Sequence, residues 1–412
     1  MKPQTASNYF TLQTIRDLCE LESLRGVWKS WQKTRDSDLD FFSGMVRSQG
    51  AGCKPHVIVL SRNSRPDALL VGFNYRKKVP LGLGPVTIHQ PEVNVLEFVY
   101  GGLLGNASKE NCTALVQAVM RSLADGNADV ALWEQLDVQS DLYTCALQLP
   151  SAVLRDHSRC LLDHWFMNFP QGLDAFLLSL GAKRRSKLRR KYQRVLNSFA
   201  GRMQVRSFRA VADLEQAIPD MEEIARKSVK RQFGYGFFDT AQIREQLLLK
   251  ATRSWLRIYI LYVDENPVSF WQGTLYERCL HADHTAFDSA WSAFSPGIFL
   301  FLDILEDLQD QDIKTIDFGC GDGQLYKCFG NMHLHEARVQ ICAPKLSALQ
   351  FHLLHTLTHY ATLLIRRTPS LNWARRIVRK ERQAMAQARL MLTADAETDS
   401  GQKTPSRKFR RT

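Results

Sequence analysis

The sequence predicts an α/β (α+β) protein of two tandem units, each a mixed central sheet flanked by helices, followed by a helical, basic C-terminal tail. Two observations carry this prediction. The chain has 412 residues, 45% of them hydrophobic, which is enough material for two buried cores. One order of elements (helix, hairpin, strand, helix, strand) is also readable in each half. The halves share little residue identity, so the architecture is duplicated without a short-period repeat.

The N-terminal half contains the first copy of this order. Residues 8–50 have helical spacing, with Trp28 and Trp31 on an apolar face. Two apolar runs around the turn Asn-Ser-Arg-Pro-Asp predict a hairpin over residues 56–75. The further elements are the strand VNVLEFVYGGLLG (93–105), the helix NCTALVQAVMRSLADG (111–126), which ends at its glycine, and the strand ADVALWEQL (128–136).

The C-terminal half contains the second copy. Its elements are the helix LEQAIPDMEEIARKSVKRQ (214–232), the hairpin LRIYILYVDENPVSFWQGTLYE (256–277), the strand RCLHADHTAF (278–287), the helix IFLFLDILEDLQDQ (298–311) and the strand IKTIDFG (313–319). We expect a boundary between the run LDHWFMNFP and the basic helix at residue 183. The expected domains are 1–165, 166–345 and a tail, 346–412, which is helical and then disordered because its end is polar.

Positive charge is concentrated in two places. The formal net charge is +12, and the segment KRRSKLRRKYQR, Lys183 to Arg194, holds eight basic residues in twelve. Further arginines follow residue 365. Such charge favours a polyanionic partner, although a solvated connecting helix would show the same pattern. No recognition motif or aromatic–basic platform accompanies the charge, so no specific nucleic-acid partner is expected.

Targeting and metal signals are weak. The nine cysteines include no C-x-x-C pair, and the first residues lack an apolar signal core, so we expect reduced thiols and a cytoplasmic location. The segment LSALQFHLLHTLTHYATLLI (346–365) contains three histidines and is a poor membrane span. Followed by arginines, it could rest on an anionic bilayer. His352, His355 and His359 share a helical face without an acid or cysteine, so we expect no metal.

The segment KTIDFGCGDGQLYKCFGN, Lys314 to Asn331, allows two interpretations. Its glycines are spaced as in the loop with which a methyltransferase binds S-adenosylmethionine. Such a loop follows the first strand of a doubly wound sheet and needs several strands after it. Only 89 residues follow Gly323, with one plausible strand, ARVQICA, and no acid where a ribose partner belongs. The methyltransferase interpretation is therefore the least favoured.

The other interpretation rests on a resemblance. Four segments resemble the GNAT superfamily of acyl-CoA N-acyltransferases, and most closely its CelD/BcsL type (BioF2-like domain): SKLRRKYQR (186–194), YILYVDENPVSFWQGTLYE (259–277), AFDSAWSAFSPGIFLFLDILEDL (286–308) and IDFGCGDGQLYKCFGN (316–331). The resemblance covers about residues 165–335 well and the N-terminal half in outline. It implies tandem GNAT folds related to Fem-type aminoacyltransferases, with a catalytic C-terminal domain and a non-catalytic N-terminal one.

The resemblance also implies where a donor binds. In this superfamily two parallel strands splay apart, and the pantetheine of acyl-CoA lies in the gap. The pyrophosphate would meet the turn Ser295-Pro296-Gly297-Ile298, where a helix N-terminus offers free N–H groups and the positive end of its dipole. The superfamily's loop is usually richer in glycine than this one. Lys327 is a further candidate for a phosphate, and acetyl-CoA or another acyl-CoA is the expected donor.

Several residues are candidates for the chemistry. Tyr326 begins a Tyr-x-x-x-Gly turn like that of the superfamily, and its phenol could protonate the departing thiolate. An amine also needs a base: His281 and Asp283 share one face of the predicted strand, with His284 on the other, and Asp288 lies at the strand end. Each of these has an ordinary structural role as its alternative. The candidates for binding substrate are Asp317, Asp322, Arg189 and Arg190.

We therefore expect direct attack of an amine on an acyl-CoA thioester. Family resemblance suggests an amino sugar or a lipid-linked sugar in exopolysaccharide or cell-envelope synthesis as the acceptor. Two alternatives stay open: a Fem-type enzyme that uses aminoacyl-tRNA, and a non-catalytic scaffold with a GNAT fold. The acyl chain, the acceptor and the oligomeric state are not determined by the sequence.

Overall fold

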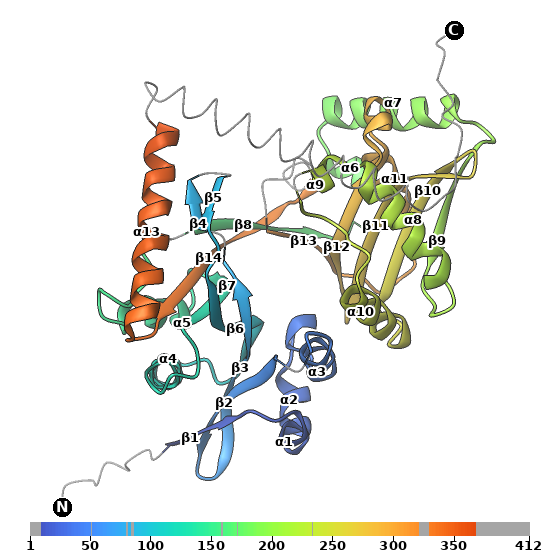
Figure 1. Cartoon of the computed structure of the whole chain (residues 1–412). Helices are drawn as coiled ribbons and strands as arrows, with labels where there is room; N and C mark the ends of the chain where they lie inside the picture. Colours follow the sequence, from blue (N-terminus) through green and yellow to red (C-terminus); the bar gives the residue numbers. More distant parts are fainter. Residues whose placement is uncertain are drawn as a thin grey trace, which may run out of the picture.

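One mixed sheet runs through the whole molecule. The computed structural model describes residues 10–50, 52–79, 81–83, 86–157, 160–170, 172–232, 234–320 and 329–367, and within them the sheet has twelve strands (Figure 1). In spatial order they are β1 (Phe10–Ile15), β2 (Lys54–Arg62), β3 (Arg65–Lys78), β6 (Glu92–Gly105), β7 (Val130–Asp137), β14 (Met332–Cys342), β8 (Cys160–Asn168), β13 (Thr315–Cys320), β12 (Cys279–Phe287), β11 (Asn266–Tyr276), β10 (Leu256–Val263) and β9 (Met203–Phe208). A small ribbon of β4 (Leu81–Leu83) and β5 (Val86–His89) stands apart. The mixed α/β class predicted from the sequence is confirmed.

Each repeat takes its sixth strand from the other repeat. β8 ends the N-terminal repeat in sequence, yet it pairs with β13 of the C-terminal repeat. β14 follows the C-terminal repeat in sequence, yet it pairs with β7, as in Cys342↔Val130. β8 and β14 also pair with each other, so they join the two halves where they cross at the centre of Figure 1. The predicted boundary after residue 165 falls inside β8, and the division into three domains stays a prediction.

Helices cover both faces of the sheet. In the N-terminal repeat they are α1 (Leu18–Leu21), α2 (Arg25–Trp31), α3 (Leu39–Ser48), α4 (Lys109–Ala124) and α5 (Asp141–Gln148). In the remainder of the described chain they are α6 (Leu173–Ser179), α7 (Ala182–Ser198), α8 (Leu214–Lys227), α9 (Val229–Gln232), α10 (Ala241–Thr252), α11 (Pro296–Asp307) and α13 (Leu346–Arg367). The helix α4 illustrates their local signals: the Ser108 hydroxyl accepts from the Asn111 N–H, and Gly126 follows its end at φ +81°.

Both predicted hairpins are confirmed. β2–β3 turns at Asn63 and Ser64 and β10–β11 at Asp264 and Glu265, all four with positive φ, as tight hairpin turns require. The sequence missed the strand before each hairpin. Residues 10–15 were expected to be helical but form β1 beside β2, and β9 takes the matching place beside β10. Both are edge strands with a single fully buried residue, so their hydrophobic pattern is faint.

Two cores hold the C-terminal repeat. α7 and α11 pack on one face, against Trp271, Leu280 and Ile316. α8 and α10 cover the other face, against Ile258, Ile260 and Phe270 and their neighbours. The sheet is therefore buried on both sides, and polar side chains inside it need partners of their own.

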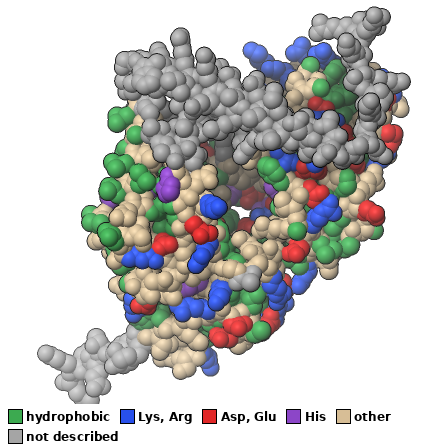
Figure 2. Space-filling view, in the orientation of Figure 1, with side chains coloured by type: hydrophobic (Ala, Val, Ile, Leu, Met, Phe, Trp, Pro, Cys, Tyr) green, Lys and Arg blue, Asp and Glu red, His purple; other side chains and the backbone are tan. Residues whose placement is uncertain are grey.

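The helix α13 leaves an apolar stripe exposed. Leu346, Leu353, Leu357 and Leu364 are between 57% and 73% exposed, and their spacing puts them on one side of the helix. In Figure 2, which shares the orientation of Figure 1, hydrophobic side chains gather along the left edge, where α13 lies. Within the described residues, no helix has the length and apolar content needed to span a membrane.

Candidate functional site

Two parallel strands of the C-terminal repeat separate after a short common stretch. β12 and β13 pair only at Cys279↔Thr315, Leu280↔Ile316 and His281↔Asp317. Beyond that point β12 continues to Phe287, while Gly319 of β13 pairs only with β8. The backbone groups that face the gap are free of ladder partners there, so this fork offers a strand edge to an extended ligand.

A cavity of about 650 Å³ opens beside the fork. It lies between the end of β12, the start of α11, the helix α7 and the end of α8. Its lining residues are Arg184, Lys187, Leu188, Lys191, Ser228, Val229, Lys230, Phe270, Trp271, Thr285, Ala286, Phe287, Ser292, Ser295, Gly297, Ile298, Leu300 and Phe329. The apolar floor and cationic rim suit a ligand with an apolar arm and an anionic end.

The basic helix α7 presents only part of its charge to the cavity. Arg184, Lys187 and Lys191 recur every three or four residues and line it. Arg189 instead lies 3.9 Å from Asp174, and Arg190 is exposed and is not a lining residue. Neither of the two substrate-binding candidates of this helix lines the cavity, and the lysines that do line it were not singled out from the sequence.

The start of α11 forms the other side of the rim. Ser295, Gly297 and Ile298 line the cavity, and Pro296 is buried at the first helical position. Ser295 precedes the helix with φ +52°, and its side chain makes no cap hydrogen bond to the helix. Its hydroxyl accepts from Lys191 Nζ at 3.4 Å instead. The first N–H groups of a helix lack intrahelical partners, so this end can bind an anion.

A fourth cation of the cavity lining, Lys230, belongs to α9. Lys230 Nζ donates to the carbonyl oxygen of Thr285 at 2.7 Å and to its hydroxyl at 3.0 Å, which ties α9 to the free edge of β12. Burial lowers the pKa of Lys230 from its usual value. An incoming anion would favour the charged form of this lysine and so offset part of that desolvation.

At the closed end of the fork, two histidines share one carboxylate. Asp317 Oδ2 lies 3.0 Å from His281 Nδ1, and Asp317 Oδ1 lies 2.6 Å from His164 Nε2. Burial opposes the protonated form of His281, but the bonds to Asp317 and Cys279 outweigh it and raise its pKa to about 9. Burial opposes ionisation of Asp317, but both histidines hold its pKa well below the usual value. His281 is not a lining residue of the cavity.

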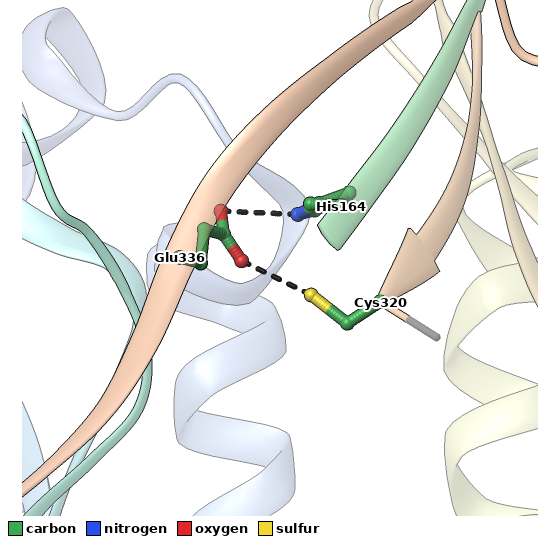
Figure 3. Close-up of side chains that lie close together, drawn as sticks. All are labelled: His164, Cys320 and Glu336. Atoms are coloured by element: carbon green, nitrogen blue, oxygen red, sulfur yellow. Dashed lines mark hydrogen bonds and ion pairs between the residues drawn. The ribbon is translucent and has the colours of Figure 1, made fainter. Parts of the chain in front are cut away.

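His164 also contacts a second set of polar side chains, Glu336 and Cys320, where the two repeats meet. His164 Nδ1 lies 3.0 Å from Glu336 Oε1, and Cys320 Sγ donates to Glu336 Oε2 at 3.2 Å (Figure 3). Burial disfavours the charged ring of His164, whereas Asp317, Cys320 and Glu336 favour it and raise its pKa to about 12. Burial and the nearby Glu336 raise the pKa of Tyr100. The sequence signals that could have indicated His164 and Glu336 are polar side chains inside the apolar strands LDHWFMN and HEARVQIC.

The sequence placed Asp283 on the same strand face as His281, but in the structure the two side chains do not form a pair. A register shift beside Gln272 and Gly273 leaves Asp283 as the extra residue of β12. Its carboxylate binds Arg35 of the N-terminal repeat and accepts from Lys250 Nζ at 2.8 Å. Burial opposes its ionisation, but these two cations hold its pKa well below the usual value. Asp283 therefore joins the repeats.

The same shift moves His284. Strand alternation predicted that His284 would lie on the opposite face from Asp283. Its ring instead contacts Phe237, in the core beneath α8 and α10. Lys250 of α10 reaches Asp283 from this same side of the sheet. Burial lowers the pKa of His284 to about 4, so it is neutral. Asp288 follows the last residue of β12, and its carboxylate accepts from the N–H of Ala290 at 2.9 Å, which caps a short 3-10 helix. Tyr326, Lys327 and Asp322 lie outside the described residues.

One segment of the chain matches a known protein family. Residues 182–327, which include α7, the fork and α11, match the family model described as acetyltransferase (GNAT) domain, over less than half of the chain. No curated protein matches the chain.

Several solved structures are similar to this chain over most of its length. The structure of FemX covers 84% of this chain and 100% of its own, with a TM-score of 0.54 at 11% identity. A tandem GNAT protein from the clavulanic acid biosynthesis pathway covers 82% and 100%, with a TM-score of 0.48 at 8% identity. A conserved protein of unknown function from Bacteroides thetaiotaomicron VPI-5482 covers 81% and 100%, with a TM-score of 0.48 at 14% identity. The FemX likeness supports the fold alone.

Proposed function

We propose that this protein is an acyl-CoA-dependent N-acyltransferase. The observation that carries the proposal is the fork between β12 and β13, with a cavity at its open end and cations around it. The free edge of β12 suits the amide groups of a pantetheine arm. The α11 N-terminus with Lys187 and Lys191 suits its phosphates, because a helix N-terminus and ammonium groups both bind anions.

The chemistry is direct transfer. An amine nitrogen attacks the thioester carbonyl carbon, a C–N bond forms, the C–S bond breaks, and the thiolate leaves. His281 is the candidate base that takes the amine proton, and Asp317 orients its ring. Tyr326 stays the candidate that returns a proton to the thiolate. The acceptor is proposed to be an amino sugar of exopolysaccharide or cell-envelope synthesis, as in a CelD/BcsL-type enzyme.

Donor binding is the decisive test, and α7 offers a matched pair of lysines. Titration calorimetry of acetyl-CoA into the full chain should show binding. Lys191→Gln should weaken it roughly tenfold, the value of one lost charge-assisted contact. Lys183→Gln removes the same charge from the same helix but outside the cavity lining, and should leave affinity unchanged.

Two results would redirect the assignment. Binding of aminoacyl-tRNA without any binding of acyl-CoA would favour the Fem-type alternative. Binding of neither donor would favour a scaffold with a GNAT fold.

We also propose that α13 lies against an anionic membrane surface. Its exposed leucine stripe provides an apolar contact, and the arginines that follow residue 365 in the sequence provide charge for acidic lipids. Such an orientation would bring the enzyme to a lipid-linked acceptor.

A further inference from the structure

Three side chains that commonly bind transition metals converge where the repeats meet. His164 comes from β8, Cys320 from β13 and Glu336 from β14, and Figure 3 shows all three directed at one another. One ligand atom of each lies within 4.8 Å of the other two. The side chains of His164 and Glu336 are 3% and 1% exposed. Imidazole, thiolate and carboxylate are the three ligand types of zinc sites.

The contact between His164 and Glu336 is close but poorly aligned for a shared proton. Nδ1 lies 3.0 Å from Oε1, yet no hydrogen bond to Nδ1 of acceptable angle exists, although this atom is fully buried. A proton bridges two atoms best on the line between them. A metal ion sits off that line, and tetrahedral zinc with bonds of about 2.0 Å to N and O and about 2.3 Å to S holds its ligands roughly 3.3–3.5 Å apart. The separations run to the two different oxygens of Glu336, 3.0 Å from Nδ1 to Oε1 and 3.2 Å from Sγ to Oε2, and each is close to this range.

Asp317 already contacts the ring nitrogen of His164 that would face away from a metal ion. Asp317 Oδ1 lies 2.6 Å from His164 Nε2 and also accepts from the N–H of Gly319 at 2.7 Å. With one proton held on Nε2 by this carboxylate, a metal ion that displaces the proton of Nδ1 would meet a lone pair directed toward Cys320 and Glu336. Carboxylate–histidine–zinc arrangements orient the ring in this way.

We propose that His164, Cys320 and Glu336 bind a zinc ion through Nδ1, Sγ and a carboxylate oxygen. Three protein ligands leave a fourth position for water or another small ligand. The neighbouring group of Cys279, His281 and Asp317 has similar spacing. It is the weaker site, because Asp317 would have to give up its bond to His281 or to His164 in order to bind metal. A site on three strands, two of them exchanged, would also fasten the repeats together.

Cobalt replaces zinc in such sites and reports its ligands. Untagged full-length protein, freed of metal with a chelator, is titrated with Co²⁺, and the thiolate-to-cobalt charge-transfer band is followed in the near ultraviolet. We expect one saturable site with this band, and zinc should displace the cobalt. Cobalt on the histidines of α13 would give no thiolate band, so it cannot imitate the result.

Paired variants identify the site. Cys320→Ser should abolish the band, and Cys279→Ser, the same change in the neighbouring group, should retain it. Asp317→Asn should keep the band but weaken affinity roughly 10–100-fold, as loss of an outer partner does. Circular dichroism of the metal-free variants checks folding. If Cys320→Ser does not fold, Glu336→Gln serves instead and should weaken affinity while keeping a shifted band.

Two results would overturn the proposal. One is the absence of a thiolate band in the wild type at equimolar cobalt, which would leave a plain hydrogen-bonded cluster. The other is a band that survives Cys320→Ser and disappears in Cys279→Ser. Neither readout depends on acyl transfer, so the zinc site and the proposed enzymatic function can fail separately.

Discussion

The electrostatics of the fork can be measured at one residue, His281. Its pKa of about 9 lies above the ordinary 6.5, because its bonds to Asp317 and Cys279 outweigh burial. At neutral pH the ring is therefore mostly protonated. As a base it must be neutral, so acyl transfer through His281 should rise as pH approaches about 9.

The titration itself gives the first prediction. The NMR signal of His281, assigned by comparison with His281→Gln, should titrate near pH 9, and Asp317→Asn should lower this midpoint by removing the favourable carboxylate. The raised folded-state pKa also stabilises the fold below pH 6.5, and this contribution is lost as pH rises through about 9. The stability advantage of wild type over His281→Gln should shrink over that range. A midpoint near 6.5 in the wild type would contradict the assigned contact.

Among the elements, the second hairpin strand of each repeat, β3 and β11, contains a glycine in the same kind of close backbone contact. A Cβ on Gly273 of β11 would lie 2.5 Å from the carbonyl oxygen of His281, and one on Gly72 of β3 would lie 2.7 Å from that of Glu97. Each glycine adjoins a register shift in the pairing with the strand that follows it, β12 for Gly273 and β6 for Gly72. Close backbone approach, not turn formation, is the reason for these two glycines. The repeats thus share a bulge that the low sequence identity hides.

The second prediction compares Gly273 with its counterpart Gly72 in the other repeat, which serves as the control. Gly273→Ala and Gly72→Ala should each destabilise the protein by about 1–3 kcal/mol, because the opposing atom is backbone and cannot turn aside. Thermal melting would measure this. Only Gly273→Ala should also weaken acyl-CoA binding below its melting temperature, since it moves β12 at the fork. Equal effects of the two variants on donor affinity would argue against the fork as the donor site.

For the whole molecule, a buried ionic cluster links the two repeats. Asp283 of β12 lies between Arg35, in the N-terminal repeat, and Lys250 of α10, and Gln272 and Thr274 also donate to it. The side chains of Asp283 and Lys250 are 11% and 6% exposed. A buried charge that loses its partner keeps its desolvation cost.

Asp283→Asn should therefore cost about 3–5 kcal/mol of unfolding free energy, because buried Lys250 loses the carboxylate it contacts and Arg35 keeps only Asp36. Urea denaturation measures the difference. The control is Glu223→Gln, which removes the exposed partner of Lys227, 2.6 Å away, and should cost less than about 1 kcal/mol. A loss as small as that of the control would show that Asp283 does not join the repeats.

The surface of α13 gives a prediction at the same scale. Leu353→Gln with Leu357→Gln should reduce sedimentation of the full chain with vesicles that contain acidic lipid, and higher salt should do the same. Leu178→Gln removes a leucine of comparable exposure, 68%, from α6, far from α13, and should have no effect. Retention of binding in the double variant would exclude the leucine stripe as the contact.

Sequence reasoning predicted the class, both hairpins, the strands β6, β7, β12 and β13, and the helices α4, α8 and α11, because their signals are local. Hydrophobic period, turn residues and glycine positions are set by neighbours in the chain. The same reasoning, with family resemblance, put the donor between β12 and β13, and this position stays a prediction. Tyr326, Lys327 and Asp322 stay predictions.

Only the tertiary structure determined which side chains lie beside Asp317 at the closed end of the fork. His164 and Glu336 come from β8 and β14, strands that pair across repeats, and no local pattern encodes which distant strand will occupy a sheet position. The single-residue shift in β12 likewise turned Asp283 away from His281, because alternation holds only while the register does. The sequence by itself determined the elements. Long-range pairing decided which charges meet, because burial obliges each one to find a partner wherever the fold provides it.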